Sequence, residues 1–181
     1  MPGGDVSPVD EPLHCHPSTQ ARTTSMSRAP SAPLHAPPRL VLDTNVVLDL
    51  LVFDDPAVRP LVQSLTAGEF TAWVDGDTLA ELEYVLAYPT FELDEAARQA
   101  ASERYRSLVH MATEDMVLPA QPLPRCRDRD DQKFLVLAAR VGATWLVSKD
   151  KRVLSLADRP GLPFGILTSR QLAERLVREA R

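Results

Sequence analysis

The sequence has only two cysteines, Cys15 and Cys126, and no long apolar run. The two cysteines have no paired spacing, which argues against a disulfide framework and against a zinc knuckle. No apolar run approaches the roughly 18 residues that a membrane-spanning helix needs. The first residues also lack a basic start followed by an apolar stretch, so no secretory signal is predicted. We therefore expect a cytoplasmic protein that does not bind a membrane.

Basic residues are outnumbered by acidic ones: the formal net charge is −5 and the isoelectric point is near 5.4. A chain of that charge binds polyanions poorly unless it carries a local basic surface. Several cations in the C-terminal third could form such a surface, although a solvated surface of mixed charge would have the same composition. These candidates are Lys133, Arg140, Lys149, Lys151 and Arg152.

Composition divides the chain into two regions. Residues 1–38 are rich in Pro, Ser, Ala and Thr and have no hydrophobic period, so we expect a disordered tail there. Met26 lies inside this stretch and could be the true start of the protein. Residues 39–181 are numerous enough and apolar enough to bury one core, which predicts a single folded domain.

Beyond residue 38, short aliphatic runs alternate with stretches of helical periodicity. Aliphatic runs of this length are typical of buried parallel strands, and the longest predicted helix covers 94–112. Thr168 and Gln171 resemble a capping box that opens a terminal helix. This alternation predicts an α/β fold with a parallel central sheet flanked by helices on both faces. We expect strands at 39–43, 70–74, 144–148 and 165–167, and a further short strand at 116–118.

Four carboxylates occupy positions at which such a sheet would bring them together. Asp43 and Asp150 each end an apolar run, while Glu81 and Asp131 lie in the first turns of amphipathic helices. In open α/β sheets the working crevice lies beyond the carboxyl ends of the strands. Acids that converge there would repel one another unless a cation lay among them. Oxygen ligands without neighbouring Cys or His favour Mg²⁺ or Mn²⁺ over Zn²⁺.

Most of these acids also have an ordinary structural explanation. Asp150 could cap the helix that follows it, and Asp130 and Asp131 could complement a helix dipole. Thr78 and Glu81 match a capping box, in which the glutamate bonds back to the backbone.

Asp43 is less easily explained by structure alone. It closes a buried strand and is followed by Thr44 and Asn45, both of which could orient its carboxylate by hydrogen bonds. This arrangement favours a catalytic role over a structural one.

Together these segments resemble the PIN-domain family, metal-dependent ribonucleases that are common among the toxins of bacterial toxin–antitoxin pairs. The resemblance covers about residues 39–173. It rests on the order of four motifs: Leu-Asp-Thr-Asn-Val at 42–46, Leu-Ala-Glu-Leu-Glu-Tyr-Val-Leu at 79–86, Cys-Arg-Asp-Arg-Asp-Asp-Gln-Lys-Phe-Leu at 126–135, and Leu-Val-Ser-Lys-Asp-Lys-Arg-Val-Leu at 146–154.

The resemblance implies a three-layer α/β/α fold and a toxin that is an endoribonuclease. It implies hydrolysis of RNA phosphodiester bonds by a water that one or two Mg²⁺ or Mn²⁺ ions activate. It also implies an antitoxin protein as partner and allows a homodimer. The implied catalytic residues are Asp43, Glu81, Asp131 and Asp150, with Asp43, Asp131 and Asp150 as metal ligands. The residues implied to orient or support them are Thr44, Asn45, Asp128, Asp130 and Ser148, and those that could contact RNA are Lys133, Lys149, Lys151 and Arg152.

Two other functions remain open at this point. Asp43 at the end of the first strand could accept a phosphoryl group, as in aspartyl-phosphate phosphotransfer or phosphatase domains. Such phosphatases use a second acid two residues after the nucleophile, where this chain has Asn45. The chain could also be a noncatalytic PIN-like module that binds RNA or a protein.

Overall fold

The computed structural model describes residues 36–179, which fall within one compact unit of the chain. Residues 1–35, and with them Met26 and nearly all of the predicted tail, lie outside the described residues. The prediction of a tail therefore stays a prediction.

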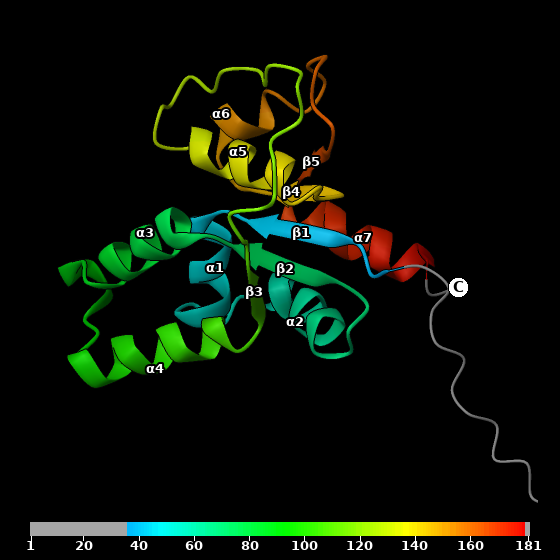
Figure 1. The fold of residues 1–181 in the computed structure, drawn as a ribbon. Helices are drawn as coiled ribbons and strands as arrows, with labels where there is room; N and C mark the ends of the chain where they lie inside the picture. Colours follow the sequence, from blue (N-terminus) through cyan, green and yellow to red (C-terminus); the bar gives the residue numbers. More distant parts are fainter. Residues whose placement is uncertain (1–35, 180–181) are drawn as a thin grey trace, which may run out of the picture. The chain divides into compact units, whose positions relative to one another are not determined.

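A five-stranded parallel sheet forms the centre of this unit, as the sequence predicts (Figure 1). The strand order is β3-β2-β1-β4-β5, and each neighbouring pair is parallel. The chain therefore builds the sheet outward from β1 in one direction and then returns to build it in the other. The strands are β1 (Arg39–Leu42), β2 (Thr71–Val74), β3 (Val109–Met111), β4 (Trp145–Val147) and β5 (Gly165–Leu167).

Helices cover both faces of the sheet, which confirms the α/β fold with three layers (Figure 1). Helices α1, α2, α3, α4 and α7 pack on one face, and α5 and α6 on the other. None of the helices within residues 36–179 is both long and apolar enough to cross a bilayer. The helices are α1 (Thr44–Leu51), η1 (Pro56–Val58), α2 (Arg59–Thr66), α3 (Gly76–Leu86), η2 (Pro89–Phe91), α4 (Glu95–Arg106), α5 (Gln132–Arg140), α6 (Lys151–Leu154) and α7 (Ser169–Glu179).

The sequence prediction is wrong between residues 94 and 118. Helix α4 ends at Arg106, the chain then forms the edge strand β3, and no strand occurs at 116–118. Leu108 and Val109 continue the apolar spacing of α4, so periodicity alone extends the helix through them. The pairing of β3 with β2 is made by the backbone, and two of the three β3 residues are exposed, so the strand leaves no alternating pattern in the sequence.

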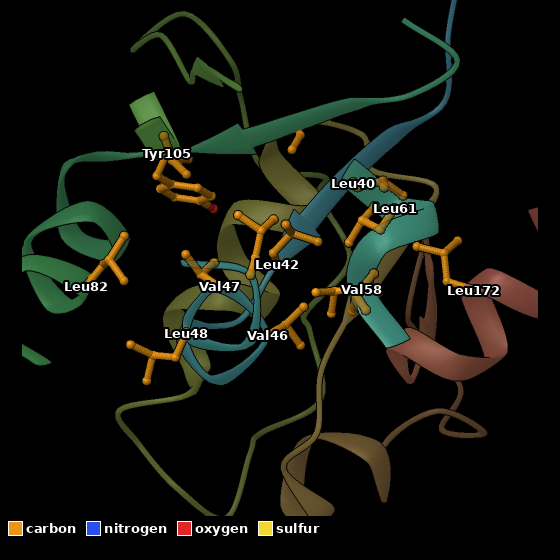
Figure 2. Close-up of a cluster of buried hydrophobic side chains, with 14 of the residues drawn as sticks. Leu40, Leu42, Val46, Val47, Leu48, Val58, Leu61, Leu82, Tyr105 and Leu172 are labelled. Carbon is orange, nitrogen blue, oxygen red and sulfur yellow. The ribbon is translucent and has the colours of Figure 1, made fainter. Parts of the chain in front are cut away.

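Alternate residues of β1 supply the two cores that hold the layers together. Leu40 and Leu42 face the cluster formed with α1 to α4 and α7, where Figure 2 shows their neighbours, while Val41 faces α5 and α6. All three are almost completely buried. Because β1 is covered on both sides, the residue that follows it leaves the sheet at a fixed position and direction.

The order of the strands predicts a ligand-binding crevice at the carboxyl ends of β1 and β4. The chain runs from β1 toward β2 and β3 and later returns to β4, so the direction of winding reverses between β1 and β4. Ligands in open α/β sheets bind outside the carboxyl ends of the strands at such a reversal. Asp43 directly follows β1, and Asp150 lies three residues after the end of β4.

We expect Gly165→Ala to destabilise the sheet, because a Cβ at residue 165 would lie 2.9 Å from Cδ1 of Trp145. The indole is confined by Phe70 on one side and the guanidinium of Arg175 on another. The indole or the backbone must shift to make room for the added methyl group. This shift should lower the free energy of unfolding, measured by urea titration, by about 1–3 kcal/mol. Gly76→Ala is the matched control: nothing lies within 4 Å of its Cβ, so it should be neutral or stabilising. Equal stability of the two variants would contradict this packing argument.

Candidate functional site

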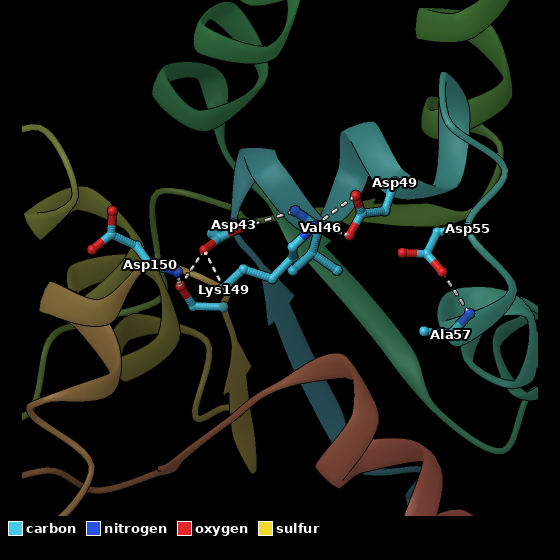
Figure 3. Close-up of polar contacts among 8 residues, drawn as sticks. Asp43, Val46, Asp49, Asp55, Ala57, Lys149 and Asp150 are labelled. Atoms are coloured by element: carbon cyan, nitrogen blue, oxygen red, sulfur yellow. Dashed lines mark hydrogen bonds and ion pairs between the residues drawn. The ribbon is translucent and has the colours of Figure 1, made fainter.

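Asp43 directly follows β1, at the predicted crevice beside β4, and is 4% exposed. As the N-cap of α1, its Oδ1 accepts a hydrogen bond from the Val46 amide at 3.0 Å. Its Oδ2 accepts from the Ser148 hydroxyl and from the Lys149 amide, the latter at 3.2 Å (Figure 3). Burial raises the pKa of Asp43, and these hydrogen bonds oppose that effect.

Ser148 connects the two strands of the crevice. It is completely buried, its hydroxyl donates to Asp43, and its oxygen accepts from the amide of Asp150 at 3.0 Å. The Ser148 hydroxyl, which the sequence predicts to support the site, thus bonds Asp43 and also holds the backbone at Asp150. Figure 3 shows Asp43 and Asp150 at the same edge of the sheet.

Thr44 and Asn45 do not orient Asp43 in the way the sequence suggests. The Thr44 hydroxyl donates to Oε1 of Glu81 at 2.6 Å instead. Asn45 is exposed, and none of the side-chain hydrogen bonds of residues 36–179 joins it to Asp43. Ser148 and two backbone amides perform that task, so Thr44 orients a different acid of the same site.

Glu81 projects from α3 and is held by two other elements. Besides the bond from Thr44 on α1, it forms an ion pair with Lys133 at the start of α5. The capping-box explanation for Glu81 is wrong, because Asp75 caps α3 and forms the reciprocal pair of bonds with Thr78. Glu81 therefore has no capping duty and faces the crevice region.

Asp150 has the structural role that the sequence allowed for. It is the N-cap of α6, and its Oδ1 accepts from the Arg152 amide at 2.6 Å. Among the hydrogen bonds of the described residues, none engages its other carboxylate oxygen. Capping and a further role at the crevice are thus compatible for Asp150.

Asp131 directly precedes α5 and has the fewest hydrogen-bond partners of the four acids. It makes no capping hydrogen bond, and its buried Oδ2 has no hydrogen-bond partner. Burial, followed by the negative charges of Asp150, Asp128, Asp43 and Glu81, raises the pKa of Asp131 to about 6. The negative charges of the other three candidate acids, Asp43, Glu81 and Asp150, thus all act on Asp131.

Cationic side chains offset only part of this negative charge. Lys133 pairs with Glu81, and Arg152 pairs with Asp128. Asp128 also accepts from the Asp130 amide at 3.1 Å, while Asp130 itself is exposed. Of the four candidate catalytic acids, Glu81 has an ion-pair partner among residues 36–179, whereas Asp43, Asp131 and Asp150 have none.

These three acids have the chemistry that a hard divalent cation requires. Oxygen ligands suit Mg²⁺ and Mn²⁺, and the unpartnered oxygen of Asp131 is a donor atom still in need of a positive partner. The side chains are not already gathered into a cation cage: among residues 36–179, no three Asp, Glu, His or Cys side chains form such a group. The residues fit a divalent metal by ligand type and by charge.

A groove of about 500 Å³ adjoins Asp150 and runs along α1. Three of its lining residues, Leu48, Asp49 and Phe53, are not among the site residues predicted from the sequence. Asp49 is 5% exposed, and both of its carboxylate oxygens accept from Nζ of Lys149, at 2.8 and 2.7 Å. Asp49 is an acid among the buried apolar residues of α1, and this unusual position could have indicated that it has a cationic partner. The lining residues are Asn45, Leu48, Asp49, Phe53, Lys149, Asp150, Lys151 and Arg152.

Comparison with known proteins gives one family and one fold neighbour of note. A family model described as a PIN domain matches residues 39–152. A crystal structure of VapBC2 from Rickettsia felis, bound to a DNA fragment from its promoter, contains a similar chain with a TM-score of 0.50 and 12% sequence identity. The match covers 72% of this chain and 98% of that chain. No curated protein gives a significant match.

We expect Asp131→Asn to stabilise the folded chain at neutral pH in the absence of metal. The pKa of Asp131, about 6 in the folded chain, lies above the value near 3.9 of an unfolded aspartate. The folded state therefore binds more protons between these values, and stability falls as the pH rises through about 6. Urea unfolding at pH 8 should show a gain of about 1 kcal/mol for the variant, after allowance for solvent screening.

The same comparison at about pH 2.5, well below the unfolded pKa near 3.9, should show no gain, because Asp131 is then protonated in both states. Asp115→Asn, which removes one negative charge from an exposed turn, controls for net charge and should lack this pH-dependent gain. An Asp131→Asn variant that is no more stable than the wild type at pH 8 would argue against repulsion within the acid cluster.

Proposed function

Because this chain belongs to the PIN-domain family, we propose that it is an endoribonuclease that hydrolyses RNA phosphodiester bonds with one or two Mg²⁺ or Mn²⁺ ions. The observation that carries the proposal is the trio Asp43, Asp131 and Asp150, three acids from separate segments that have no ion-pair partner in the described part of the chain. PIN domains are generally nucleases, and these acids lie where strand winding reverses, the usual binding edge of an open α/β sheet.

Asp43, Asp131 and Asp150 are the residues that would hold the metal. When bound, the ion supplies Lewis acidity toward the phosphate and a water of lowered pKa. Asp43 suits a fixed ligand because Ser148 and two backbone amides already hold its carboxylate. Mg²⁺ or Mn²⁺ is the ion that we propose, since no nitrogen or sulfur ligand belongs to the set.

Glu81 would act as the positioning acid of the site. The Thr44 hydroxyl fixes one oxygen, and Lys133 neutralises the carboxylate. Glu81 held in this way can accept a hydrogen bond from the attacking water and orient it toward the phosphorus. The Lys133 ammonium, 27% exposed at its side chain, can at the same time offer positive charge to the substrate phosphate.

Phosphoryl transfer through Asp43 is the less favoured function. Both oxygens of Asp43 accept hydrogen bonds and the residue is 4% exposed, so its carboxylate is poorly presented as a nucleophile. The exposed Asn45 also stands where the related phosphatases have their second acid. An acid-labile phosphate on Asp43 after incubation with a phosphodonor would favour this rival.

We also propose that the chain is the toxin of a toxin–antitoxin pair and that a cognate antitoxin protein is its partner. The resemblance to PIN-domain toxins supports this, and the fold neighbour comes from a structure of VapBC2. A noncatalytic module that binds RNA or a protein is the alternative, and metal binding without RNA cleavage would select it.

We predict that Asp43→Asn abolishes RNA cleavage while the fold is kept. The amide keeps the shape of the side chain but removes the charge, so cleavage of a mixed RNA pool with Mn²⁺ should fall at least ~100-fold, in line with the several kcal/mol that such a centre supplies. Circular dichroism checks the fold, and Asp115→Asn is the control for loss of one acid. Cleavage by Asp43→Asn at the wild-type rate would refute the proposed site.

We also predict that Mn²⁺ raises the melting temperature of the wild type. An ion that binds only the folded state adds about 2.7 kcal/mol of stability at a hundred times its dissociation constant. Asp131→Asn should lose most of this gain, because the oxygen in need of a cation is gone. NaCl at equal ionic strength is the control for screening. An equal shift in both proteins would show that the ion binds elsewhere.

A further inference from the structure

The groove beside Asp150 combines an exposed aromatic ring with several cations. Its walls come from α1 and the turn after it on one side and from the start of α6 on the other. It begins at Asp150, one of the acids of the proposed site, and reaches as far as Phe53. A ligand that entered it would therefore lie next to the reaction centre.

Phe53 is the most exposed phenylalanine of the described residues. It is 59% exposed, whereas most Phe, Tyr and Trp side chains in residues 36–179 are buried or half-buried. Its ring meets that of Phe91 edge to face, with centroids 5.9 Å apart and planes at 65°. This contact leaves more than half of the Phe53 residue open to a ligand.

The three cationic side chains of the groove differ in whether an ion pair already holds them. Nζ of Lys149 is bound to both carboxylate oxygens of Asp49, so it forms a fixed part of the wall. Lys151 and Arg152 are exposed. Arg152 pairs with Asp128 at the surface, while Lys151 takes part in no ion pair within residues 36–179. These two side chains can turn toward a phosphate in the groove.

We propose that this groove binds the nucleotide next to the cleaved bond of a single-stranded RNA. Its base stacks on Phe53, and its phosphate is held by Lys151 and Arg152. The Lys149–Asp49 pair is a positioning element that keeps the groove wall in place. This inference rests on the proposed function, since it assigns part of the substrate to a surface that continues from the proposed catalytic acids.

Charge complementarity favours RNA over a peptide as the occupant. Aromatic stacking combined with cations along the backbone is the usual way of binding single-stranded nucleic acid, and it tolerates many base sequences. The chain as a whole carries a net charge of −5, so cations gathered beside the acids have a specific use. A partner peptide that occupies the same groove is an outcome that the experiment below separates.

The test measures binding of a short fluorescein-labelled single-stranded RNA in the Asp43→Asn background, which prevents cleavage. In anisotropy titrations with Mg²⁺, Phe53→Leu should weaken binding roughly 5- to 100-fold, the range for loss of one stacked base. Phe53→Trp should bind as tightly as the parent or more tightly. Phe91→Leu is the matched control, because it removes the same ring–ring contact but leaves the Phe53 ring in the groove.

The charge contribution is tested by the salt dependence of the same titrations. Lys151→Ala should lower the slope of log affinity against log salt concentration by about 0.7, as expected for one phosphate contact on a single strand. Arg104→Ala, which removes one positive charge from the exposed face of α4, should leave the slope unchanged.

Two results would overturn the inference while leaving the proposed function intact. In both, the wild type cleaves RNA. In the first, Phe53→Leu binds RNA as tightly as the parent; in the second, Phe53→Leu and Phe91→Leu lose RNA affinity equally. Either would leave a peptide as the better occupant. Absence of cleavage by the wild type would instead defeat the proposed function.

A second measurement keeps the inference testable if Phe53→Leu folds poorly. Photocrosslinking of 5-iodouridine RNA to the Asp43→Asn protein should attach the RNA at Phe53, as mapped by mass spectrometry. Attachment only at residues outside the groove would overturn the assignment.

Discussion

The hydrogen bond from Ser148 to Asp43 joins the ends of the two central strands, and the geometry of the site depends on it. Asp43 also extends the ladder itself, since its amide donates to the Val147 carbonyl at 3.0 Å. An ionisable group this deeply buried is tolerated because three donors meet its carboxylate. The same serine fixes the amide of Asp150. Two acids from opposite halves of the sequence thus share one support.

Around this support the fold gathers more negative charge than it neutralises. Lys133 forms an ion pair with Glu81, Arg152 with Asp128, and Lys149 with Asp49. Burial of Asp131, followed by the negative charges of its acidic neighbours, raises its pKa to about 6. Unrelieved repulsion of this kind lowers stability and is tolerated where a ligand of opposite charge makes use of it. The proposed metal would offset this excess of negative charge, whereas the proposed RNA groove depends on the exposed cations Lys151 and Arg152.

The sequence predicts those parts of the structure that depend on local chemistry. The sheet class, most elements and the caps at Asp150 and Thr168–Gln171 follow from apolar periods and short-range hydrogen bonds. Strand β3 was missed because an exposed edge strand is defined by backbone pairing alone. The bond from Thr44 to Glu81 and the Lys149–Asp49 pair join residues 37 and 100 positions apart. Only the folded chain brings such partners together.

The placement of the acids on the innermost strands has a consequence for local unfolding. Strand β3 is at one edge of the sheet, short and largely exposed, so it belongs to the part of a fold that opens at low free energy. Strands β1 and β4 are enclosed by neighbours on both sides and open only with the whole unit. Hydrogen exchange at the rim can therefore be fast while the carboxylates stay aligned, and fluctuations of the periphery need not interrupt the chemistry at the centre.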